Sequence, residues 1–262
     1  MKIRALLFFI SIVLLVTAGY LAEERAKHET GIIKRAVDGD TIEMSNGNKI
    51  RLLGVNTPEK NTPFYQEAKN FLKDFENKEV DIYWTIENTD KYSRLLRYVF
   101  FEEKLLNEEI LAKGLGNAYV YKEDKYTKRL RGAEEKARKR GIGLWERSRD
   151  KCGECFSAFI DNGAGKNDCL ARGESVELKN NCDFSCFVEK WYVKDNANHV
   201  FVFGNISIGA GKSVVIYNGI GKENETSFYF NNKGECASVW NDEGDSLFLR
   251  DKEGRLAFYE AY

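Results

Sequence analysis

Three short stretches of the sequence gather carboxylate, amide and guanidinium groups that could act together on one substrate. They are VDGDT at 37–41 with Asp40, RLLGVNTPE at 51–59 with Arg51, Asn56 and Glu59, and DKYSR at 90–94 with Arg94. Oxygens from Asp40, Asn56 and a backbone carbonyl suit a hard cation such as Ca²⁺. Two arginines clamp a phosphate, and a nearby carboxylate accepts a proton from attacking water. The set indicates metal-assisted phosphodiester cleavage.

Each stretch also has a purely structural interpretation. An Asp-Gly-Asp sequence is common in turns, and Arg51 could be a solvated strand residue. Thr-Pro-Glu could begin a helix, with Glu59 close to the N-terminal amides. Taken singly, each stretch fits that interpretation, whereas the order and spacing of all three together favour the catalytic one.

Residues 29–149 are predicted to form an α+β domain that positions these groups. Short β-rich runs occur at 31–37, 40–44, 49–55, 79–85 and 95–101. Apolar residues at helical spacing predict helices near 64–75, 107–113 and 125–140, with Asn107 as an N-cap and Gly114 and Gly141 as C-terminal stops. Five strands and three helices in this order suit a five-stranded OB-type barrel.

Residues 31–148 resemble the staphylococcal nuclease family over their whole length. The matching text is VDGDT, RLLGVNTPE, DKYSR, the tail of AKGLGNAYVY at 112–121, and AEEKAR followed by GIGLW at 133–145. The resemblance implies an OB-fold nuclease that cleaves DNA and RNA with Ca²⁺ as cofactor.

The resemblance also assigns roles to individual positions. It implies Asp40, Asn56 and the Thr57 carbonyl as metal ligands, Glu59 as general base, Arg51 and Arg94 as phosphate-binding residues, and Tyr92, Tyr119 and Tyr121 as aromatic residues of the nucleotide site. Stacking of a base on an exposed tyrosine gives the last role a physical basis. Tyr119 and Tyr121 fit a strand edge packed on the barrel equally well.

Two residues depart from the family pattern. Asn56 stands where the best-known member has aspartate, so the site carries less negative charge and should bind Ca²⁺ more weakly. Ser93 replaces the glycine of DKYGR, which could shift the loop that aims Arg94. The connection from Glu59 to the first helix is also short, which trims the loop beside the site.

The first 28 residues are predicted to target the chain to a membrane. Lys2 and Arg4 precede an uncharged apolar run at 5–22. Its length fits an uncleaved anchor, and a signal peptide fits as well. The positive-inside rule then places the remaining domains outside, at the cell surface, or secreted if the segment is cleaved.

All six cysteines follow residue 150: Cys152, Cys155, Cys169, Cys182, Cys186 and Cys236. An even number in an exported unit indicates disulfides, whose pairing the sequence leaves open. A zinc site beginning at Cys152-x-x-Cys155 and a redox-active CxxC are the alternatives.

Residues 150–262 are predicted to form a second, all-β unit. Strand-like runs recur at 175–180, 187–193, 199–204, 212–218, 227–230, 246–251 and 255–260. This stretch resembles the lamin-tail domain, an immunoglobulin-like β-sandwich, in the text at 158–182, 191–203 and 238–256. The resemblance implies Cys169 and Cys182 as a pair, and Trp191 and Trp240 are expected in the core.

The predicted function is that of an exported, membrane-anchored, Ca²⁺-dependent nuclease. The chain carries 40 basic and 41 acidic residues, and the excess acid lies in the C-terminal unit, which argues against strong DNA binding there. An envelope component or another protein is the expected partner of that unit. The alternatives are a non-catalytic nucleic-acid-binding module with a decayed metal site and a surface scaffold protein.

Overall fold

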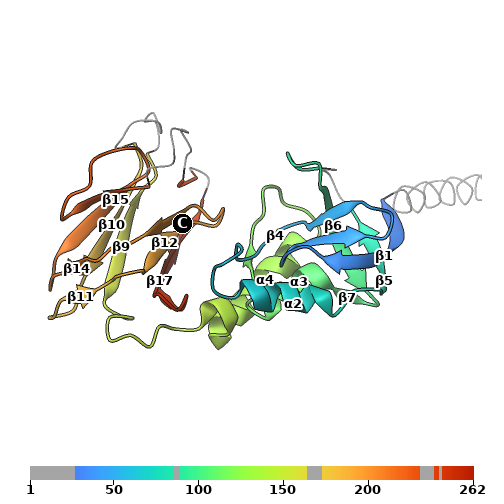
Figure 1. Cartoon of the computed structure of the whole chain (residues 1–262), viewed down its shortest axis with the longest axis horizontal. Helices are drawn as coiled ribbons and strands as arrows, with labels where there is room; N and C mark the ends of the chain where they lie inside the picture. The colour runs from blue at the N-terminus through green and yellow to red at the C-terminus, as the bar shows by residue number, and fades with distance from the viewer. Residues whose placement is uncertain (1–26, 85–88, 164–172, 231–238, 242–243) are drawn as a thin grey trace, which may run out of the picture.

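A computed structural model describes residues 27–84, 89–163, 173–230, 239–241 and 244–262. Figure 1 shows two bodies, a barrel with helices and a β-sandwich, joined through the segment that follows the last helix. In these ranges no helix is long and apolar enough to cross a membrane. The predicted anchor at 5–22 lies outside them.

The first body is the predicted five-stranded closed barrel. Its strands are β1 (His28–Ala36), β2 (Thr41–Met44), β3 (Lys49–Leu52), β5 (Glu79–Tyr83) and β6 (Leu95–Phe101). They pair in the order β3-β2-β1-β5-β6, and a parallel pairing of β3 with β6 closes the barrel. Inward residues such as Ile42, Ile50 and Val99 are fully buried, as alternation along half-buried strands requires.

Two short pairings complete the barrel. Strand β7 (Lys104–Leu105) pairs antiparallel with the end of β6, and β4 (Val55–Asn56) pairs with β8 (Asn117–Ala118) as a separate ribbon. The strand predicted at 49–55 ends at Leu52, because the chain turns at Leu53 and Gly54 and then pairs again as β4. Asn56 therefore lies in this ribbon and not in the barrel sheet.

Three helices cover the barrel, as predicted: α2 (Tyr65–Lys73), α3 (Leu106–Ala112) and α4 (Thr127–Arg140). Gly141 ends α4 in the left-handed conformation expected of it. The predicted N-cap role of Asn107 is wrong, because the cap is Leu105. Asn107 lies buried in the first turn of α3, where its amide donates to the Leu53 and Arg97 carbonyls and its oxygen accepts from Val99 N.

The second body is the predicted β-sandwich. One sheet has the order β16-β15-β10-β9 and the other has the order β13-β12-β17-β18. Strands β11 and β14 form a separate two-stranded ribbon. The strands are β9 (Phe156–Asp161), β10 (Ser175–Asn180), β11 (Cys186–Phe187), β12 (Tyr192–Lys194), β13 (Val200–Val202), β14 (Ser207–Ile208), β15 (Ser213–Tyr217), β16 (Ser227–Tyr229), β17 (Ser246–Arg250) and β18 (Leu256–Ala261). Trp191 and Trp240 are buried in its core, as expected.

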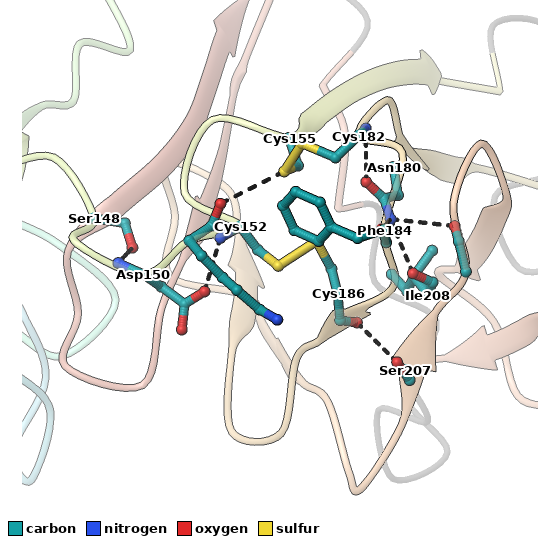
Figure 2. The surroundings of a disulfide bond; sticks show 12 residues. Ser148, Asp150, Cys152, Cys155, Asn180, Cys182, Phe184, Cys186, Ser207 and Ile208 are labelled. Atoms are coloured by element: carbon teal, nitrogen blue, oxygen red, sulfur yellow. Dashed lines mark hydrogen bonds between the residues drawn. A yellow bond between two sulfur atoms is a disulfide. The ribbon is translucent and has the colours of Figure 1, made fainter.

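Two disulfides fasten the start of the sandwich (Figure 2). They join Cys152 to Cys186 and Cys155 to Cys182. The expected pairing of Cys169 with Cys182 is therefore wrong: the Cα atoms of Cys155 and Cys182 lie 5.2 Å apart, within normal bridging range. Because each cysteine of the CxxC sequence is bridged to a cysteine outside it, the structure favours disulfides over the zinc and redox alternatives. Cys169 and Cys236 lie outside the described residues.

The sheet that contains β12 and β17 lies on the side of the sandwich that faces the barrel (Figure 1). A small apolar cluster joins the bodies there: Ala137 of α4 and Trp145 pack with Phe248, Leu256 and Tyr259. Arg250 donates to the Leu144 carbonyl at 2.5 Å, Ser148 N donates to the Leu256 carbonyl, and Leu256 N donates to the Glu146 carbonyl. The GLW turn (Gly143–Trp145, η1) is thus part of the contact between the two bodies.

Candidate active site

The Asp-Gly-Asp turn brings Asp40 against the segment that follows β4. Asp40 immediately precedes β2, and Thr57 immediately follows β4. A Cβ atom added at Gly39 would meet Thr57 Oγ1 at 2.6 Å and the Ala68 Cβ at 2.7 Å. Glycine is therefore required at 39 by the close approach of Thr57 and α2.

Asp40 is the centre of a hydrogen-bond network. Its Oδ2 accepts from the Thr57 N–H at 3.0 Å and from Thr57 Oγ1 at 2.8 Å. Its Oδ1 accepts from Thr41 Oγ1 and forms an ion pair with Arg51 Nε, each at 3.1 Å. The Arg51 Nη2 donates to Asn56 Oδ1, also at 3.1 Å. Four predicted site residues, Asp40, Arg51, Asn56 and Thr57, are thus directly connected.

Arg94 joins this network through one hydroxyl group. Its Nη1 donates to Thr41 Oγ1 at 3.1 Å, while its Nε donates to Asp90 Oδ2 at 2.7 Å. Ser93 has φ 62°, the left-handed conformation that favours glycine. The turn is closed by Ser93 N, which donates to the Asp90 carbonyl at 3.0 Å. From this turn Arg94 reaches Thr41 Oγ1, and an effect of the serine on the aim of Arg94 stays a prediction.

Glu59 follows Thr57 by two residues and does not bond to the network. In the part of the chain that the structure describes, its carboxylate makes no hydrogen bond or ion pair, and its side chain is exposed. Its carbonyl accepts from Thr62 N and Oγ1, which fixes the turn before α2. Glu59 lines a cavity of about 210 Å³ with Asn117 of the barrel and Asn198 of the sandwich. An unpaired, exposed carboxylate is available to accept a proton.

The predicted ligands fit a hard cation. Asp40, Asn56 and Thr57 are 6%, 8% and 4% exposed, and they offer a carboxylate, a carboxamide and a main-chain carbonyl. The Arg51 guanidinium contacts both Asp40 Oδ1 and Asn56 Oδ1, so these two oxygens already face one positive group. The three ligands carry one full negative charge, which is consistent with weaker metal binding than a pair of aspartates would give.

Asp38 is a residue that the sequence interpretation overlooked. Its Oδ1 accepts from the Asp40 N–H at 3.1 Å. Burial and the neighbouring Asp40 carboxylate raise the pKa of Asp38 to about 6. A cation bound nearby would favour its charged form. The first aspartate of the Asp-Gly-Asp sequence was the only signal that could have pointed to it.

The three tyrosines lie at two places around the site. Tyr92 is exposed, and the Arg94 guanidinium lies 5.4 Å from the centre of its ring. Tyr119 follows β8, is half-buried, and makes an edge contact with the exposed Tyr121 ring at 4.6 Å. Tyr119 and Tyr121 line a cavity of about 910 Å³ whose other wall includes Asn196 and Asp245 of the sandwich. Their contact with a nucleotide stays a prediction.

Both bodies match known protein families. Residues 49–147 match the model for staphylococcal nuclease homologues, and residues 155–261 match the model for the Lamin Tail Domain. The fold, the site and these matches define a nuclease-type barrel followed by a lamin-tail sandwich.

Curated relatives extend this result. A thermonuclease from Staphylococcus intermedius is 35% identical over 130 residues, which are 45% of this chain and 77% of the relative. An uncharacterised endonuclease from Haemophilus influenzae is 31% identical over 136 residues, 50% of this chain and 74% of the relative. Endonuclease YncB from Bacillus subtilis is 35% identical over 132 residues, 44% of this chain and 61% of the relative. The chain belongs to the staphylococcal nuclease family.

Proposed function

We propose that the chain is a Ca²⁺-dependent nuclease that hydrolyses phosphodiester bonds of DNA and RNA. The observation that carries the proposal is the network that joins Asp40, Arg51, Asn56 and Thr57 and reaches Arg94 through Thr41. The names of the nuclease relatives support the choice of a nucleic-acid substrate. Hard oxygen ligands support the choice of Ca²⁺.

The side chains have complementary tasks in this proposal. Asp40, Asn56 and the Thr57 carbonyl hold the cation, which when bound polarises the phosphoryl group. Arg51 and Arg94 bind the scissile phosphate and stabilise the negative charge that grows on it. Glu59 accepts a proton from the attacking water. Tyr92, Tyr119 and Tyr121 provide faces on which bases stack.

We further propose that the chain acts outside the cell. The two disulfides support an oxidising compartment, because such bridges persist mainly in exported proteins. The apolar run at 5–22 supports attachment to the membrane. In this arrangement the lamin-tail sandwich binds an envelope component or another protein.

The direct test follows cleavage of single-stranded DNA and RNA oligonucleotides by the full chain, folded with its disulfides, across a Ca²⁺ titration. Cleavage should rise with Ca²⁺, stop with chelator, and need at least about tenfold more Ca²⁺ in Asp40→Asn, since a ligand charge is lost. The matched control, Asp183→Asn, changes an exposed aspartate of the sandwich and should leave cleavage unchanged.

Circular dichroism of Asp40→Asn should match that of the unaltered chain, so that any loss of cleavage is not a loss of folding. A chain that binds the oligonucleotides but cleaves neither at any Ca²⁺ concentration contradicts the proposal and favours the non-catalytic binding module. A folded chain that neither binds nor cleaves favours the scaffold alternative.

A further inference from the structure

One turn of the lamin-tail sandwich lies directly against the metal ligands of the barrel. This β12–β13 turn comprises residues 195–199. Asn56 Nδ2 donates to the Asn196 carbonyl at 2.7 Å, and Asn198 Nδ2 donates to the Thr57 carbonyl at 3.2 Å. Both barrel partners are predicted ligands of the cation, and both bonds connect them to a different domain.

Hydrogen bonds within the β12–β13 turn and to its neighbours fix its conformation. The buried Asp195 carboxylate accepts from the His199 N–H at 2.7 Å and lies 2.6 Å from His199 Nδ1. Asn196 N donates to Asp245 Oδ1 at 3.2 Å. Asn198 Oδ1 accepts from Lys194 Nζ at 2.7 Å. The bonds within the turn and to its neighbours Lys194 and Asp245 hold the Asn196 carbonyl and the Asn198 amide in fixed positions.

The contact with Asn196 selects the orientation of the Asn56 carboxamide. A carboxamide has a donor end and an acceptor end. With Nδ2 bonded to the Asn196 carbonyl, Oδ1 faces Arg51 and the region next to Asp40. An aspartate at 56 would place a carboxylate oxygen against the Asn196 carbonyl. The asparagine that departs from the family pattern is therefore matched to the sandwich.

The contact with Asn198 acts on the second ligand. A carbonyl oxygen has two lone pairs, so the Thr57 carbonyl can accept from Asn198 Nδ2 and still bind a cation. Asp40 fixes the N–H and hydroxyl of the same residue. Thr57 is thereby held from the barrel side and from the sandwich side.

We propose that the β12–β13 turn is part of the nuclease site and positions Asn56 and Thr57 for metal binding. Asn196 and Asn198 are positioning residues that act through the ligands, in the way that outer-shell groups orient metal ligands elsewhere. The proposal rests on the Ca²⁺ site of the proposed function. It predicts that the nuclease barrel depends on its lamin-tail sandwich for metal affinity.

The test substitutes Asn198→Gly in the full chain. Asn198 has φ 70°, which glycine adopts readily, so the variant should fold. Calorimetric titration with Ca²⁺ should show about tenfold weaker binding, the lower end of the loss seen when outer-shell partners are removed. The Ca²⁺ midpoint of single-stranded DNA cleavage should shift by the same factor, and the rate at saturating Ca²⁺ should change less.

Asn77→Gly is the matched control. Asn77 is an exposed asparagine with φ 63° in the turn before β5, on the barrel and not in contact with the sandwich turn. It should leave Ca²⁺ binding unchanged.

A double-mutant cycle with Asn56→Asp tests whether the two contacts act together. The aspartate removes the donor to Asn196, so Asn198→Gly should weaken Ca²⁺ binding less in that background than in the unaltered chain. Equal losses in both backgrounds would contradict joint positioning.

Other outcomes overturn the inference in distinguishable ways. If the unaltered chain binds Ca²⁺ and cleaves DNA but Asn198→Gly binds Ca²⁺ equally well, the turn contacts the site without contributing to metal affinity. If Asn198→Gly cleaves faster with unchanged Ca²⁺ affinity, the turn covers the site instead of supporting it. If the unaltered chain neither binds Ca²⁺ nor cleaves, the proposed function fails, and the inference fails with it.

Discussion

Asp40 organises the site at the scale of single residues, because its two oxygens meet four donors from three neighbours. It fixes the Thr57 backbone, and its ion pair with Arg51 connects it to Asn56. The sequence motifs predicted that these residues act together, and the structure connects them in one network, while their catalytic and metal-binding roles stay predictions. Asp38 was missed, because its altered pKa arises from burial that a linear motif does not display.

Ser93→Gly is a prediction at this scale. Ser93 adopts φ 62°, a conformation that costs a non-glycine residue about 1–2 kcal/mol. Glycine removes that cost but loses more entropy on folding. We expect the free energy of unfolding to rise by about 0.5–1 kcal/mol, with cleavage unchanged, as measured by urea denaturation and oligonucleotide cleavage. A loss of stability would show that the serine side chain has a favourable contact of its own.

At the scale of elements, periodicity predicted the strands and helices of the barrel, but local roles depended on the surroundings. The sequence predicts Asn107 as an N-cap, whereas in the fold its side chain hydrogen-bonds three backbone groups of the barrel. Strand β9 was not predicted, because FSAFID shows no clean alternation: none of Ser157 to Asp161 is fully buried. The disulfide pairing also depends on which strand ends meet in space.

The β12–β13 turn allows a prediction about pH. The hydrogen bond to Asp195, opposed by burial and supported by Asp245 and Glu174, raises the pKa of His199. The protonated histidine therefore contributes stability that is fully present below about pH 6.5 and is lost as pH rises through the higher folded pKa. The stability difference between the unaltered chain and His199→Gln should decline over that interval.

Urea denaturation of both proteins from pH 5 to pH 9 measures this difference. Burial lowers the pKa of the adjacent Lys194 to about 7, which gives stability that increases with pH, but both proteins share this contribution and it cancels. Nuclear magnetic resonance of the His199 ring should give a pKa above the usual 6.5. A flat stability difference, or a lower pKa, would contradict the assigned hydrogen bond.

At the scale of the whole molecule, the two bodies form one structural unit around the site. Trp145 is 1% exposed and lies between α4 and the sandwich residues Phe248 and Tyr259. Composition and charge predicted two domains, whereas nothing in the sequence indicated that residues 140 positions apart would meet at Asn56. Contacts of this kind depend on how two completed domains pack, which no local pattern encodes.

Trp145→Ala should weaken the contact between the two bodies. Truncation of a buried tryptophan costs about 3–5 kcal/mol. Because Trp145 belongs to the contact between the bodies, we expect the single thermal transition of the unaltered chain to fall in temperature and split into two in differential scanning calorimetry. Trp191→Ala, inside the sandwich, should destabilise that body without releasing the barrel first. Two separate transitions in the unaltered chain would contradict the coupling.

The central claim is that this site catalyses phosphodiester hydrolysis with Glu59 as the base. The most direct measurement is the single-turnover rate of single-stranded DNA cleavage at saturating Ca²⁺ in Glu59→Gln, beside Glu103→Gln in the exposed β6–β7 turn as control. We predict a loss of roughly 100-fold or more in Glu59→Gln, with Ca²⁺ and DNA binding retained, and no change in the control. A Glu59→Gln rate within a few-fold of the unaltered chain would contradict the claim.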